Sequence, residues 1–150
     1  MSWNDLRAGR YSQPYGEYFI TFNTHKRTPF FNNFHTAKLF CQQISFHEEQ
    51  HQCCWLAWVL MPDHFHGILR LNDINTDLSK NIAALKGSSA YLINKKLNRK
   101  GQVWQPAFFD RALRKEEDRL QIARYIVANP LRGNIVSDLG CYPFWNSVYL

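Results

Sequence analysis

The sequence has no long apolar run. No stretch approaches the roughly 20 consecutive apolar residues that a membrane-spanning helix requires. The first seven residues, MSWNDLR, contain no apolar core of the kind that a secretory signal needs. These absences exclude an obvious membrane segment, so we expect no membrane partner and a location in the cytoplasm.

Cysteine is scarce, and its spacing fits neither metal binding nor cross-linking. The four cysteines include no Cys-x-x-Cys pair, and they are Cys41, Cys53, Cys54 and Cys141. The adjacent pair would point to opposite faces of a strand. This pattern argues against a zinc knuckle and against a disulfide framework. We expect four buried thiols in a reducing compartment.

Internal repeats, linkers and low-complexity segments are also missing. A chain of 150 residues with 45% apolar and 15% aromatic residues is long enough to bury a core. We therefore expect one domain over residues 1–150. Residues 1–16 are polar and predict an irregular N-terminal arm, whereas the aromatic residues 141–150 predict a tail that docks on the domain.

Acidic residues are fewer than basic ones. The chain has 18 Lys and Arg against 12 Asp and Glu, giving a net charge of +6 and a pI near 9.3. Twelve of the 18 basic residues, but only five of the 12 acidic ones, lie at or after Lys80. A basic half favours a polyanionic partner, with nucleic acid first. Charge alone does not distinguish this from a generally basic protein.

Apolar periodicity predicts the order of the elements. Strands are expected over 17–22, 53–60 and 64–71, with strand and loop over 103–114. Helices are expected over about 34–50, from an N-cap at Asp77 or Ser79 to Gly101, and from 116 to Val127 or Asn129. This order predicts an α+β protein, a ferredoxin-like βαββαβ sandwich with an added C-terminal helix. Such a fold does not itself imply a function.

His64 and His66 stand two residues apart on an expected strand. Side chains two apart share a face, so the histidines project together and Phe65 points the other way, toward the core. Two imidazoles on one face supply half of a divalent-metal site. The alternatives are polar residues on a solvated face, or incidental histidines on a core strand.

Tyr125 and Asn129 are four residues apart on the last expected helix. Together with Gln121 they would form one polar strip, opposite the inward-facing Leu120, Ala123 and Val127. Two alternatives remain open at this point. A tyrosine on an amphipathic helix is often a packing residue with a wet hydroxyl. A residue before proline is disfavoured in helices, so Asn129, which precedes Pro130, would merely end the helix.

The motif MPDHFH at 61–66, followed by YIVANP at 125–130, resembles the single-tyrosine HUH transposases. The closer similarity is to the REP-associated tyrosine transposases. Further matching stretches, in the same order, are residues 6–12, 85–87, 101–105 and 142–145. Together they cover nearly the whole chain. One departure is at the arm, where the chain reads GRYS at 9–12 and many members have a second tyrosine.

The resemblance implies an enzyme that cuts and rejoins single-stranded DNA beside hairpins, with REP-like palindromes as the partner. Tyr125 matches the nucleophile, which attacks phosphorus and leaves a 5′-phosphotyrosine link. His64 and His66 match two metal ligands, and Asn129 matches the position of a third. The implied cofactor is Mg²⁺ or Mn²⁺. Both monomers and homodimers fit the resemblance.

Other side chains are weaker candidates. Five basic residues could contact phosphate or could be solvated surface charges: Arg10, Lys86, Arg111, Arg114 and Arg124. His47 and His51 have the spacing of helical metal pairs, but they lack a metalloprotease glutamate, so we interpret them as structural. Two rival functions stay open, a catalytically idle protein that binds structured DNA or RNA, and a metal-dependent nuclease that uses water.

Overall fold

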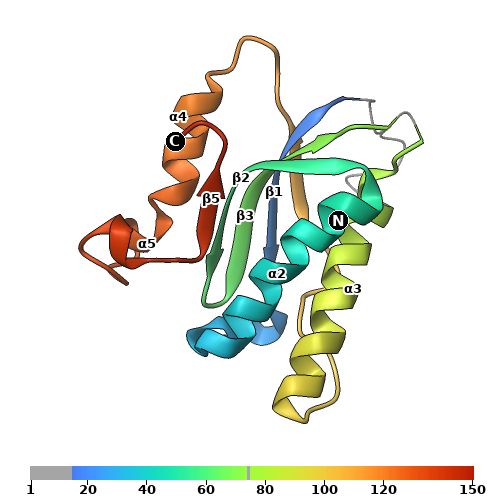
Figure 1. Cartoon of the computed structure of the whole chain (residues 1–150), viewed down its shortest axis with the longest axis vertical. Helices are drawn as coiled ribbons and strands as arrows, with labels where there is room; N and C mark the ends of the chain where they lie inside the picture. The colour runs from blue at the N-terminus through green and yellow to red at the C-terminus, as the bar shows by residue number, and fades with distance from the viewer. Residues whose placement is uncertain (1–14, 74) are drawn as a thin grey trace.

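A five-stranded antiparallel sheet forms the middle of the molecule (Figure 1). The computed structural model describes residues 15–73 and 75–150. The sheet order is β4-β1-β3-β2-β5, and the strands are β1 (Glu17–Asn23), β2 (Cys53–Met61), β3 (His64–Leu71), β4 (Phe109–Ala112) and β5 (Trp145–Ser147). The first four strands have the ferredoxin-like order, with β5 added beside β2. The predicted fold class is confirmed.

Helices cover both faces of this sheet (Figure 1). Two long helices, α2 (Phe34–His51) and α3 (Leu78–Leu97), pack on one face. The other face carries α4 (Arg119–Val127), which is followed by the short α5 (Asn129–Arg132). Single 3₁₀ turns lie at His25–Arg27, Phe30–Asn32 and Leu139–Cys141. None of the helices in the described ranges is long and apolar enough to cross a membrane.

Side-chain caps fix where the long helices begin. The Asn33, Asp77 and Asp118 side chains accept hydrogen bonds from backbone N–H groups in the first turns of α2, α3 and α4. The predicted end of the second helix is wrong. It stops at Leu97 because Asn98 adopts a left-handed conformation with φ of 50°, and Gly101 lies in the turn beyond.

Alternation along β3 separates two cores. Phe65 is fully buried and stacks on Phe22, with ring centroids 4.9 Å apart, on the face that α2 and α3 cover. On the opposite face, Ile68 packs in the cluster that contains Ala123 and Ile126 of α4. Both faces of β2 are buried as predicted. The expectation of four buried thiols holds only for Cys53, because Cys41 and Cys54 are half-buried and Cys141 is exposed; the cysteines form no disulfide.

His47 lies in the first of these cores, with 3% of its surface exposed. Its Nδ1 accepts a hydrogen bond from Trp55 Nε1 at 3.3 Å, so its Nε2 carries the proton that faces the Asn81 carbonyl oxygen 3.0 Å away. Burial lowers the pKa of His47 to about 4. A second proton on Nδ1 would face the indole N–H, so the folded protein holds this ring neutral.

We expect acid to destabilise the protein partly through His47. An unfolded histidine binds a proton below pH 6.5, whereas folded His47 does so only near pH 4. The contribution of His47 to the free energy of unfolding is therefore complete above pH 6.5. It is lost as the pH falls toward 4, by up to about 3 kcal/mol. Urea unfolding across this range should show the loss. A His47→Gln variant should be less stable at neutral pH and less sensitive to acid; equal pH dependence in both proteins would contradict the assignment.

Candidate active site

The strand β3 presents His64 and His66 toward the α4 face of the sheet. Their ring centroids are 4.7 Å apart, and both side chains are half-buried. In the ladder, His66 is opposite Thr21 of β1 and Val59 of β2. The two imidazoles therefore share one face, as the alternation predicted, at the centre of the sheet.

Each of these histidines has a partner on one ring nitrogen only. His66 Nδ1 is 2.7 Å from Thr21 Oγ1, and His64 Nδ1 is 2.7 Å from Asp63 Oδ1. Arg27 Nε in turn pairs with Asp63 Oδ2 at 3.0 Å. Neither Nε2 atom has a hydrogen-bond partner within residues 15–73 and 75–150. A hydroxyl or carboxylate on the second nitrogen is the usual support of a metal-binding histidine.

Electrostatics keeps both rings in the form that binds metal. Burial lowers the pKa of His64, although the Asp63 carboxylate opposes this effect. Burial, together with the charges of His64, Arg132 and Arg27, lowers the pKa of His66 to about 4. A neutral imidazole has a free lone pair for a cation. The residues present therefore fit a divalent metal bound through two Nε2 atoms.

A third metal ligand would have to be a side chain other than His, Cys, Asp or Glu. The described part of the chain contains no group of three His, Cys, Asp or Glu side chains placed to hold a metal. Asn129 follows the break after Val127 and begins α5, so the single continuous helix expected to carry both Tyr125 and Asn129 is wrong. Its amide nitrogen donates to the Ile126 carbonyl at 2.9 Å, which leaves Oδ1 as the atom that could face a cation.

Tyr125 lies on the outer side of α4, with 58% of its surface exposed. This exposure does not fit a packing role. The tyrosine lines a cavity of about 520 Å³ together with Phe19, Phe109 and Gln121. Phe19 also contacts the His66 ring, with centroids 5.9 Å apart. Phe19 therefore joins the cavity of Tyr125 to the histidine pair.

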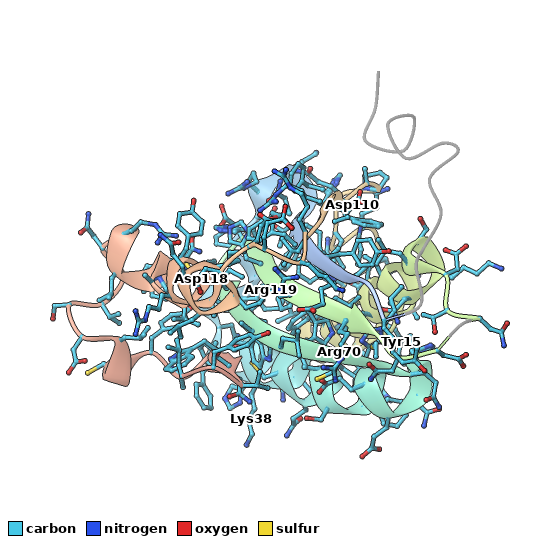
Figure 2. The ribbon with its side chains drawn as sticks, turned by 90° about the horizontal axis from the view of Figure 1, so that it is seen from above. Tyr15, Lys38, Arg70, Asp110, Asp118 and Arg119 are labelled. Carbon is cyan, nitrogen blue, oxygen red and sulfur yellow. The ribbon has the colours of Figure 1, made fainter. Side chains whose placement is uncertain are left out.

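An ion pair at its first turn fixes α4 on the sheet. Arg119 Nε binds Glu17 Oε1 at 3.0 Å, and Glu17 is opposite Arg70 in the β1–β3 ladder. Figure 2 shows Asp118 and Arg119 next to each other at the start of α4. The helix that carries Tyr125 is thus held at one end by charge and along its length by Ala123 and Ile126.

Sequence reasoning missed Arg132, Thr21 and Arg27. The Arg132 guanidinium carbon lies 4.1 Å from the centroid of the Tyr125 ring. Arg132 lies on α5, beyond the break after Val127, so helical spacing from the tyrosine gave no signal for this contact. The other two come from β1 and the turn that follows it, and only the β1–β3 pairing brings them to the histidines.

The predicted basic residues do not form one group. Arg111 lines the Tyr125 cavity and pairs with Glu117 at 2.7 Å. Arg114 and Arg124 are exposed near and on α4. Lys86 is on α3, across the sheet, where its Nζ donates to the carbonyls of Gln105 at 2.6 Å and Ala107 at 3.1 Å. Arg10 and nearly all of the expected arm lie outside the described residues.

Comparisons with known proteins agree on one family. A family model described as IS200-like transposases matches residues 13–129. A REP-associated tyrosine transposase from Escherichia coli (strain K12) is 30% identical over 88 residues, which are 59% of this chain and 50% of that protein. The chain thus spans about half the length of that relative. A Haemophilus influenzae protein, provisionally named as the same kind of transposase, is 24% identical over 144 residues, covering 86% of this chain and 78% of that protein.

A solved structure has a similar fold. It is a REP-associated tyrosine transposase bound to a REP hairpin, with a TM-score of 0.75 and 25% sequence identity. The similarity covers 91% of this chain and 79% of the other. The shared fold therefore extends well beyond the two histidines and the tyrosine.

Proposed function

Because the chain belongs to the family of IS200-like transposases, we propose that it cleaves and rejoins single-stranded DNA next to a hairpin through a 5′-phosphotyrosine intermediate. One observation carries the proposal. Two imidazoles whose pKa values burial lowers share a sheet face with the helix that exposes Tyr125, and neither Nε2 atom has a hydrogen-bond partner among the described residues. Two histidines that can hold a metal ion, beside an accessible hydroxyl that can act as the nucleophile, are the minimum that such a reaction requires.

In the proposed reaction, the Tyr125 oxygen forms a bond to phosphorus as the bond from phosphorus to the 3′-oxygen breaks. The phenolic proton leaves to solvent, and the 3′-oxygen takes up a proton. The DNA segment on the 3′ side of the cut stays on the protein through its 5′-phosphate, so the phosphodiester energy is conserved for rejoining. His64, His66 and the Asn129 Oδ1 would hold Mg²⁺ or Mn²⁺, which supplies charge stabilisation at the phosphate when bound.

The cavity beside Tyr125 gives unpaired DNA a place to bind. Phe19 and Phe109 meet edge to face there, with ring centroids 6.4 Å apart. Aromatic side chains of this kind stack on unpaired bases regardless of sequence. Arg114 and Arg124 are exposed near and on α4 and would contact phosphates. The similar transposase bound to a REP hairpin supports hairpin DNA as the partner.

DNA binding tests this proposal first. We expect a hairpin with a single-stranded flank to bind more tightly than a blunt duplex of the same length. Affinity should fall steeply with salt, with a logarithmic slope of about −0.7 per phosphate contact on the single strand. A band-shift titration at several salt concentrations measures both. Equal affinity for a random duplex, or affinity that salt does not change, would contradict the proposal.

A further inference from the structure

Arg132 is an unpaired cation stacked on the proposed nucleophile. Its guanidinium carbon lies 4.1 Å from the centroid of the Tyr125 ring, within the range of a cation–π contact. The residue is exposed, and it has no carboxylate partner within the described residues. Arg119 of α4 and Arg111 of β4, by contrast, each pair with a glutamate. The charge of Arg132 is therefore available to an anionic ligand.

The short helix α5 fixes this arginine beside the tyrosine. Pro130 is buried, and Asn129 is tied to α4 by its hydrogen bond to Ile126. The Arg132 backbone N–H donates to the Ala128 carbonyl at 3.0 Å, and Gly133 N–H donates to the Asn129 carbonyl at 2.9 Å. A Cβ atom at Gly133 would lie 3.3 Å from that same oxygen, so a glycine suits this tight turn.

The turn that carries Arg132 also lies near the histidine strand. A Cβ atom at Gly133 would lie 3.5 Å from Met61 Cε, and Met61 is opposite His64 in the β2–β3 ladder. Arg132 therefore contacts Tyr125 from a turn that packs beside the strand next to the histidines. If the tyrosine attacks a phosphate that a metal on the histidines polarises, that phosphate must lie close to this turn.

We propose that Arg132 is a positioning residue, which holds the Tyr125 ring by stacking and binds a non-bridging oxygen of the scissile phosphate. This inference rests on the proposed function. A planar guanidinium can do both at once, because its face contacts the ring while its N–H edge remains directed to the oxygen. A lysine would keep the charge but would lose the planar stack and the paired donors.

The test is single-turnover adduct formation at saturating hairpin DNA, with the full chain. Arg132→Met should lower the rate by about 100-fold, the order found for loss of one preorganised donor. The rate of Arg132→Lys should lie between the rates of Arg132→Met and the wild type. DNA affinity, measured in the Tyr125→Phe background, should change only a few-fold, because one phosphate contact is a small part of the total. Lys38→Met, which removes an exposed charge on α2, is the matched control and should react normally.

A second readout separates positioning from folding. In NMR spectra the Arg132 side-chain protons should be shifted upfield by the tyrosine ring, and this shift should persist in Tyr125→Phe and vanish in Tyr125→Leu. An Arg132→Met rate within a few-fold of wild type would overturn the inference while leaving the proposed function intact. A wild-type protein that forms no adduct would instead overturn both.

Discussion

Replacing His64 or His66 by alanine is expected to abolish DNA cleavage while the protein remains folded. Both side chains present Nε2 to the same space. Losing either one therefore removes one of the two histidine ligands of the proposed metal site. Loss of a mere supporting partner costs a metal site about 10- to 100-fold, so loss of a ligand should cost more than about 100-fold. The measurement is cleavage of a labelled hairpin with Mg²⁺ or Mn²⁺, with and without a chelator.

Two comparisons make the histidine result specific. Asn129→Ala should reduce cleavage less than either histidine variant, because water can replace a neutral amide oxygen. Thermal unfolding should show that the histidine variants remain folded, since Phe65, on the opposite face, is what packs into the core. Full cleavage in the presence of chelator, or by the histidine variants, would remove the metal from the mechanism.

The substitution Tyr125→Phe should eliminate cleavage and the covalent adduct together. It removes only the hydroxyl from a side chain that is 58% exposed, so stability should change by no more than about 0.5 kcal/mol. The Arg132 contact depends on the ring and should survive. The measurement is a denaturing gel with DNA labelled on the 3′ side of the cut, where the wild type should give a shifted protein band.

The structure identifies the better control for this substitution. Tyr91 is 66% exposed on α3, so Tyr91→Phe should retain full activity. Tyr142 is less suitable, because it is buried and its hydroxyl donates to the Leu60 carbonyl. Cleavage by Tyr125→Phe at the wild-type rate would favour the rival function, a nuclease that uses water.

The alternation and spacing of apolar residues predicted most of the fold, because these patterns follow from the geometry of single strands and helices. Alternation over 64–71 placed the histidines on one face and Phe65 in the core. The break after Val127 was harder to predict, since Pro130 permits either a helix end or a kink. The sequence could not show that Asn129 would bind Ile126, or that Lys86 would bind carbonyls of the following loop. These contacts depend on where the chain turns, which residue types alone do not determine.

The candidate site was predictable only in part, for a similar reason. The histidines and the tyrosine belong to recognisable motifs, and these positions were expected from the sequence. Asp63 is adjacent to His64, but Thr21 and Arg27 reach His66 and Asp63 only through pairing between strands that are distant in sequence. Basic residues were predicted from charge alone, and charge does not distinguish Arg111, which has a partner, from Arg124, which is exposed on α4.

Mass spectrometry of the trapped adduct tests the central claim most directly. The wild-type protein is incubated with hairpin DNA and divalent metal, digested, and searched for a peptide carrying a 5′-phosphonucleotide. We predict that this nucleotide is found on Tyr125. Cleavage without any protein-bound nucleotide, or an adduct on another residue, would contradict it.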